Sequence, residues 1–123
     1  MKSIMIVEGD ESVRMMLVGV AKMMGFNRII ASPNTINALK LWDKSPNFEI
    51  VITDLSLSGI SGIQFANIIK NNVSQKGNEK PKIILLTSHV NIDLAAAAKD
   101  IDLVLYKPIH ILELQTAIEK LLA

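Results

Sequence analysis

Ile50-Val51-Ile52-Thr53-Asp54 is a run of β-branched residues that ends on a single carboxylate, and its pattern recurs along the whole chain. Apolar runs of strand length occur at residues 3–7, 28–31, 49–53, 82–87 and 102–106. Longer segments of helical periodicity separate these runs. Strands that alternate with helices predict a parallel sheet with helices on both faces, so we expect an α/β fold built from five βα units.

The polar residues that follow the runs are the candidate site. Asp54, Thr87 and Lys107 each stand at the end of an apolar run, and a fourth run ends in Glu8-Gly9-Asp10. Because the carboxyl ends of parallel strands share one edge of the sheet, these side chains can converge although they are far apart in sequence. An Asp, a Thr and a Lys are the polar groups of a phosphoryl-accepting site, and adjacent carboxylates would serve a metal there.

Length and composition fit a single globular domain, expected to span residues 1–123. A chain of 123 residues can bury a core without metals or disulfides. Half of its residues are hydrophobic but only 4% are aromatic, which predicts an aliphatic core. There is no cysteine, so disulfides, thiolate zinc sites and cysteine nucleophiles are excluded.

Charge and hydropathy exclude two further classes of function. The formal net charge is +1 and the basic residues are scattered, so we expect no direct nucleic-acid binding. No apolar run approaches the roughly 20 residues that cross a bilayer, and the first run is too short for a signal peptide. We therefore expect no membrane insertion, and a cytoplasmic location.

The first two predicted helices cover residues 10–25 and 32–43. Asp10 suits an N-cap and Gly25 a C′ residue. Apolar residues form one helical stripe between them: Val13, Met16, Leu17, Val20 and Met24. Ser32-Pro33 reads as N-cap and N1 of the second helix, which ends at about Asp43 and carries Trp42 as a packing residue.

Three more helices are expected. The third starts at about Ser61 and dissolves in the polar stretch 71–80. Its expected apolar side holds Phe65, Ile68 and Ile69. The fourth is a short alanine-rich segment at residues 91–98. The fifth follows Lys107-Pro108, and its expected apolar face holds Ile111, Leu114, Ile118 and Leu121.

At this point the motifs match a known family. The chain resembles the receiver domain of two-component response regulators, in the manner of stand-alone chemotaxis-type receivers. The resemblance covers essentially the whole chain and rests on four motifs in order: Val7-Glu8-Gly9-Asp10 with Arg14 downstream, residues 54–62, Thr87-Ser88 and Lys107-Pro108. It implies a flavodoxin-like, doubly wound sheet in the strand order 2-1-3-4-5 with five covering helices.

The resemblance also implies a phosphorelay function. Asp54 would accept a phosphoryl group from a sensor histidine kinase or phosphotransfer protein, forming an acyl phosphate. Lys107 would pair with a phosphoryl oxygen, and Mg²⁺ would be held by Glu8, Asp54 and the backbone carbonyl of Ser56. Thr87 would move toward the phosphoryl group. This movement would alter the surface formed by the expected helix at 91–98, the expected strand at 102–106 and the expected helix after Lys107-Pro108, where a downstream protein target binds. No enzymatic reaction is expected beyond transfer onto Asp54 itself.

The chain departs from the family pattern in its acidic pocket. Gly9 stands where a carboxylate normally touches the metal, so we expect weak Mg²⁺ binding. With Glu8, Asp54 and Lys107 the formal charges sum to minus one, against minus two with a third carboxylate. Asp10 could turn inward and restore that charge, or it could cap the first helix, which is the commoner role of such an Asp.

The readout positions depart as well. Val104 occupies the position of the family's aromatic switch residue, and Tyr106 lies two residues later on the same strand face. Ser58 replaces the proline common after the phosphoacceptor. His89, like Ser56, matches a position that tunes dephosphorylation, although a solvated loop histidine is the alternative interpretation.

Three functions therefore remain open at this stage. The first is a phosphorylatable receiver. The second is a degenerate receiver that acts as a phosphorylation-independent interaction module, in which Lys107 forms only a structural ion pair with Asp54 and Glu8. The third, a phosphatase of the haloacid dehalogenase type, needs a second acid two residues after the nucleophile, and that position is Ser56.

Overall fold

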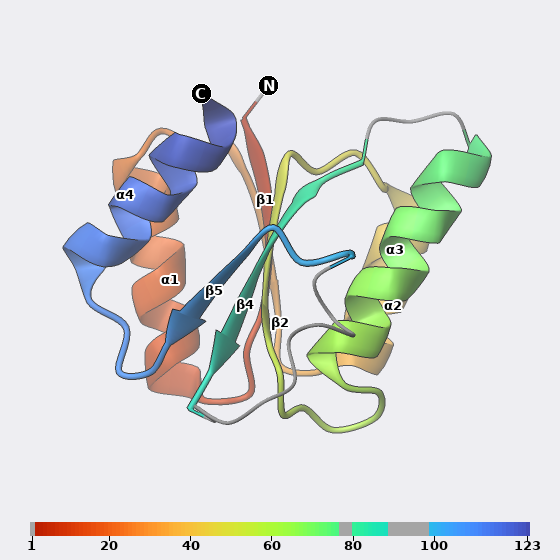
Figure 1. The fold of residues 1–123 in the computed structure, drawn as a ribbon, viewed down its shortest axis with the longest axis horizontal. Coiled ribbons are helices and arrows are strands. Elements are labelled where there is room, and N and C mark those ends of the chain that lie inside the picture. The colour runs from red at the N-terminus through yellow and green to blue at the C-terminus, as the bar shows by residue number, and fades with distance from the viewer. Residues whose placement is uncertain (1, 77–79, 89–98) are drawn as a thin grey trace.

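A computed structural model describes residues 2–76, 80–88 and 99–123 of the chain. Its centre is one five-stranded parallel sheet in the order β2-β1-β3-β4-β5 (Figure 1). The strands are β1 (Ser3–Val7), β2 (Arg28–Ser32), β3 (Ile50–Asp54), β4 (Lys82–Thr87) and β5 (Leu103–Tyr106). The predicted strand runs and the predicted strand order are confirmed.

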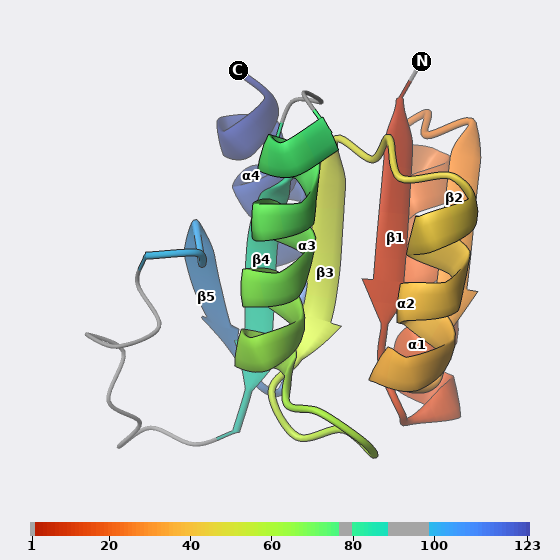
Figure 2. The same ribbon diagram turned by 90° about the vertical axis from the view of Figure 1, so that its right-hand side faces the viewer.

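Four helices cover the two faces of this sheet in the described part of the chain. α1 (Glu11–Met23) and α4 (Ile111–Leu122) lie on one face, and α2 (Thr35–Lys44) and α3 (Gly62–Lys76) lie on the other (Figures 1 and 2). The predicted fifth helix is thus α4. The helix predicted at residues 91–98 lies outside the described residues.

The core has two halves because the central strands are apolar on both faces. Along β1, Ile4 and Ile6 belong to the cluster under α1 and α4, whereas Met5 and Val7 belong to the cluster under α2 and α3. This alternation is the two-residue period of a strand, and burial on both faces is typical of parallel sheets. All five residues of β1 are therefore buried, as expected of a central strand.

Side-chain caps fix the first residues of α1 and α3. Asp10 caps α1 by accepting a hydrogen bond from the Val13 N–H, and Gly25 beyond the helix has a φ of 87°, as predicted. Ser61 and Gln64 form a reciprocal capping box at the start of α3. Both caps lie at the carboxyl edge of the sheet, where the strands end.

The predicted start of the second helix is wrong. Ser32 is the buried last residue of β2, and its hydroxyl donates to the Asn34 carbonyl. The N-cap is Asn34, whose Oδ1 accepts the Asn37 N–H, and the helix ends at Lys44. A side chain that is committed to the strand end cannot also cap the helix, so the helix begins three residues after Ser32.

Two predictions about helix faces are also wrong. Ile68 is 42% exposed although Phe65 and Ile69 are fully buried, and Ile111 is 48% exposed although Leu114 and Ile118 are buried. Both exposed residues lie at the margin of an apolar stripe, where periodicity alone does not fix the boundary. The predicted end of the third helix is confirmed, because α3 ends at Lys76, inside the polar stretch 71–80.

Other packing predictions are confirmed. Trp42 is 1% exposed and stacks on Phe48 with ring centroids 5.7 Å apart. Met16 and Met24 pack against the core, while Met15 and Met23 face solvent.

No helix in residues 2–76, 80–88 and 99–123 has the length and apolar character needed to cross a membrane.

Candidate functional site

Glu8, Asp54 and Lys107 converge at the carboxyl edge of the sheet. Glu8 follows β1, Asp54 ends the neighbouring β3, and Lys107 follows the edge strand β5. The Lys107 Nζ lies 2.8 Å from Glu8 Oε1 and 3.1 Å from Asp54 Oδ2. The two carboxylates stand at the β1/β3 switch point, which is where a sheet of this order binds ligands.

The two acids of this ion-pair triad are largely buried. The Glu8 side chain is 1% exposed, the Asp54 side chain 12% and the Lys107 side chain 24%. Burial alone would lower the pKa of Lys107, but hydrogen bonds and charge from Glu8 and Asp54 outweigh it and raise that pKa above its ordinary value. The lysine is therefore held as a cation between the two acids.

The backbone around the triad is tied down at each strand end. Arg14 Nη1 donates to the Glu8 carbonyl at 2.8 Å and to the Gly9 carbonyl at 3.4 Å. The Lys107 N–H donates to the Thr87 carbonyl at 2.9 Å, and the Lys107–Pro108 peptide is cis. Arg14, which the sequence analysis grouped with Glu8-Gly9-Asp10 as one motif, thus contacts that motif directly.

Gly9 and Asp10 adopt the arrangement that leaves the acidic pair incomplete. Asp10 is exposed and its side chain serves the first turn of α1, while its N–H donates to Glu8 Oε2 at 3.1 Å. Gly9 is exposed and has no positive φ, and a Cβ added to it would meet nothing closer than the Pro33 carbonyl at 3.6 Å. Position 9 could therefore hold a side chain, but here it supplies none.

The switch positions lie on β4, which is beside the strand of Asp54, and on the edge strand β5. Thr87 is the buried last residue of β4 and pairs in register with Tyr106, which is 41% exposed. Val104 pairs with Leu85, two residues before the Thr87–Tyr106 pair, and is half-buried. His89 lies outside the described residues, so its tuning role stays a prediction.

The loop between β3 and α3 carries Ser56, which is exposed. Its backbone carbonyl is the metal ligand that the family resemblance implies. One residue that the sequence did not single out contacts this loop: Thr35, whose Oγ1 lies 3.1 Å from the Ser58 carbonyl and 2.9 Å from the Ile60 carbonyl. These contacts span more than twenty residues of chain, and no sequence motif signals them.

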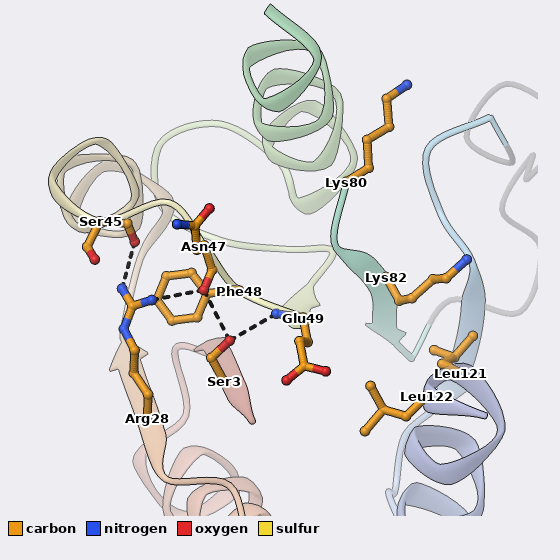
Figure 3. A pocket seen from close by; sticks show the side chains of 10 residues that line it. All are labelled: Ser3, Arg28, Ser45, Asn47, Phe48, Glu49, Lys80, Lys82, Leu121 and Leu122. Atoms are coloured by element: carbon orange, nitrogen blue, oxygen red, sulfur yellow. Dashed lines mark hydrogen bonds between the residues drawn. The ribbon is translucent and has the colours of Figure 1, made fainter. Parts of the chain in front are cut away.

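A second concave region lies at the opposite, amino edge of the sheet (Figure 3). Its volume is about 750 Å³, and Arg28, Glu49, Lys80 and Lys82 supply its charges. Arg28 already donates to the Ser45 and Asn47 carbonyls and lies 4.0 Å above the Phe48 ring. This arginine thus ties the loop before β3 to β2, and none of the predicted site residues lines the cavity.

The oxygen donors at the carboxyl edge are of the kind that Mg²⁺ takes, but they are few. Glu8 and Asp54 bring two carboxylates toward one point, and hard oxygen ligands are the magnesium preference. Within the part of the chain that the structure describes, no three His, Cys, Asp or Glu side chains gather as a metal cluster. The residues fit Mg²⁺ with one carboxylate fewer than an acid at position 9 would give.

Fold and site together define a class: a flavodoxin-like domain with a buried Asp at the switch point of the sheet and a lysine that follows the edge strand. A family model described as the response regulator receiver domain matches residues 4–119. The chain therefore belongs to the response regulator receiver domain family, whose general role is phosphorelay signalling. No curated protein matches it.

Solved structures of receivers superpose along nearly the whole chain. The response regulator TrrA from Thermotoga maritima, solved in complex with Mg²⁺-BeF, is 28% identical with a TM-score of 0.83, over 98% of this chain and 99% of TrrA. Vibrio cholerae CheY4 is 19% identical with a TM-score of 0.84, over 98% of each chain. A receiver from Clostridium thermocellum is 20% identical with a TM-score of 0.83, over 98% of this chain and 94% of that one.

Proposed function

We propose that this receiver takes a phosphoryl group on Asp54 from a sensor histidine kinase or phosphotransfer protein. The observation that carries the proposal is the position of Asp54: its carboxylate ends β3 at the switch point, 3.1 Å from the Lys107 ammonium. A buried acid at this edge beside a fixed cation is suited to receive a negatively charged group.

The proposed reaction is a nucleophilic displacement at phosphorus. An Asp54 oxygen forms a new P–O bond while the P–N bond of the donor phosphohistidine breaks, and the imidazole leaves with the bonding electrons. The main obstacle is the approach of a carboxylate to a phosphoryl group that is already negative. Lys107 reduces this repulsion because its ammonium is a positive charge 3.1 Å from Asp54, and its Nζ would shift from the acids to a phosphoryl oxygen.

Mg²⁺ would complete the neutralisation when bound. Glu8, Asp54 and the Ser56 carbonyl would hold it, and TrrA has been solved with Mg²⁺-BeF. The bound ion would supply positive charge beside the phosphoryl oxygens. With Gly9 in the acidic pocket we propose weak binding, since changes around a metal ligand alone typically cost about 10- to 100-fold in affinity. Asp10 stays in its capping role.

The proposed output surface includes β5 and the start of α4. Thr87 ends the strand beside β5, so its movement toward a phosphoryl group would be felt at its register partner Tyr106. Ile111 and Leu112 add exposed apolar area nearby, and Leu112 is 75% exposed. Exposed apolar residues of this kind suit a protein target. Beyond phosphoryl transfer onto itself we propose no enzymatic activity.

A second function has a specific observation in its favour. Lys107 pairs with both Glu8 and Asp54 and leaves the three groups with a formal charge of only minus one, and Gly9 removes one acid that would demand a divalent cation. Such a pocket could be stable in a single state. The alternative is therefore a degenerate receiver that binds its protein target without phosphorylation.

Acetyl phosphate labelling separates the two functions. The wild-type protein is incubated with acetyl phosphate and Mg²⁺, and intact mass is followed over time beside a receiver of known competence. We expect slow gain of one phosphoryl group, and none in Asp54→Asn. No adduct on the wild type, under conditions that label the competent receiver, would favour the interaction module.

A further inference from the structure

The first residue of α2 contacts the loop that carries Ser56. Thr35 is fully buried, and its hydroxyl lies within hydrogen-bonding distance of two carbonyls of the β3–α3 loop, Ser58 and Ile60. A hydroxyl has one proton to donate, so the two carbonyls share it. Because the group is buried, water cannot replace the lost bond if the hydroxyl is removed.

The loop also fits against α2 without spare room. Gly59 has a φ of 93°, and a Cβ built on it would lie 2.9 Å from Ile36 Cγ1 and 3.2 Å from Thr35 Oγ1. Glycine is needed here both for the left-handed backbone and for the close approach. Thr35 and Ile36, two consecutive residues of α2, therefore fix the middle of the loop.

The ends of the loop are held by other contacts. The Leu55 N–H donates to the Leu86 carbonyl at 2.9 Å, and the Gly62 N–H donates to the Leu55 carbonyl at 3.0 Å. In the described residues, the side chain that holds residues 56–60 to another element by hydrogen bonds is Thr35. Ser56 lies between these anchors, two residues after Asp54 and two before Ser58.

We propose that Thr35 is a positioning residue for the Asp54 site: by holding the Ser58 and Ile60 carbonyls it fixes the loop that presents the Ser56 carbonyl, and thereby sets Mg²⁺ affinity and the rate of phosphorylation. This inference rests on the proposed function. The role of Thr35 matters because position 9 supplies no acid. A larger share of the Mg²⁺ affinity then depends on the remaining oxygens, and one of these is the Ser56 carbonyl. A backbone ligand contributes only if its loop is held in place.

Two substitutions separate the hydroxyl from the rest of the side chain. Thr35→Val keeps the branched shape and removes the donor, and Thr35→Ser keeps the donor. Thr116→Val is the control, because Thr116 Oγ1 donates to the Leu112 carbonyl at 2.9 Å on α4, across the sheet from α2. Thermal melts establish that each variant folds.

Three readouts are compared. Hydrogen exchange without Mg²⁺ reports the loop directly, Mg²⁺ titration calorimetry reports the metal site, and acetyl phosphate labelling reports the reaction. For Thr35→Val we expect faster exchange at residues 55–61 with α4 unchanged, Mg²⁺ affinity lower by about 10-fold, and slower labelling. Thr35→Ser and Thr116→Val should behave like the wild type. If the wild type binds Mg²⁺ too weakly to titrate, the series is repeated in a Gly9→Asp background.

Unchanged loop exchange or unchanged Mg²⁺ affinity in Thr35→Val would overturn the proposal. Exchange that rises equally in α4 would also overturn it, and so would a Thr35→Ser protein whose loop exchange and Mg²⁺ affinity differ from the wild type. Failure of the proposed function has a different signature. In that case the wild type takes no phosphoryl group at all, while exchange and Mg²⁺ titration still decide the role of Thr35.

Discussion

The Lys107 ammonium lies 2.8 Å from Glu8 Oε1, and within the described part of the chain no other group pairs with that oxygen. The same ammonium reaches Asp54, so one side chain from the edge strand holds two acids from the centre of the sheet. The charge balance of the site therefore depends on Lys107, and the most direct tests alter it.

Removing Lys107 should destabilise the fold. In Lys107→Met the buried Glu8 loses its partner, and we expect the free energy of unfolding to fall by about 2–3 kcal/mol in urea denaturation. Adding Glu8→Gln should recover part of the loss because the uncompensated charge is gone. Additive losses in the double variant would contradict a coupling between the two residues.

The raised pKa of Lys107 predicts a loss of stability in alkali. The folded protein holds this proton more tightly than the unfolded chain, whose lysine has a pKa near 10.5. The stabilisation is therefore complete below pH 10.5 and declines as pH rises through the higher folded pKa. Urea titrations below and above this pH should show the decline in the wild type, and a smaller one in Lys107→Met. Parallel curves would show that Lys107 does not contribute.

An acid at position 9 should strengthen metal binding. The Gly9 backbone conformation suits any residue, and a Cβ there has room, so Gly9→Asp should fold normally. We expect its Mg²⁺ affinity to rise by about 10-fold or more in titration calorimetry. Gly9→Asn is the matched control without the charge. Equal affinities for the Asp variant and the wild type would sink the argument that Gly9 weakens the site.

Asp10 should matter for stability and not for the metal. Its Oδ1 accepts the Val13 N–H at 2.9 Å, so Asp10→Ala should lower the free energy of unfolding by about 1 kcal/mol. Asp10→Ser keeps a capping oxygen and should retain most of that stability. Mg²⁺ affinity should stay within about twofold of the wild type in both variants, allowing for the loss of one nearby exposed charge. A tenfold drop in both would assign Asp10 to the metal instead.

Two glycines should respond in opposite directions to alanine. A Cβ on Gly62 would overlap the Asp54 carbonyl, so Gly62→Ala should displace the end of β3 and destabilise the protein. Gly19 lies exposed in the middle of α1 with open space around it, so Gly19→Ala should stabilise by about 0.5–1 kcal/mol. Thermal melts of both variants check this, and a stable Gly62→Ala protein with normal Asp54 labelling would contradict the close approach.

The sequence alone predicted the parts of this protein that depend on local pattern. The strand runs, the Asp10 cap and the core stripe of α1 follow from residue periodicity and capping chemistry, which act over a few residues. The resemblance to receivers supplied the strand order and the site residues, because four motifs in order are specific even where each alone is weak. The Ser32 cap was wrong because this side chain ends β2 and bonds to the Asn34 carbonyl. The predicted burial of Ile68 and Ile111 was wrong because burial at the margin of an apolar stripe depends on neighbouring elements.

Tertiary structure decided how the site is held together. The Lys107 ion pairs join β5 to strands two and three positions away in the sheet, and the Thr35 contacts join α2 to a loop more than twenty residues later. Neither relationship has a sequence period, since each arises only when the sheet and its covering helices are assembled. The run that ends on Asp54 thus placed this carboxylate at the edge of the sheet, while folding brought the Lys107 ammonium against it and Thr35 against its loop.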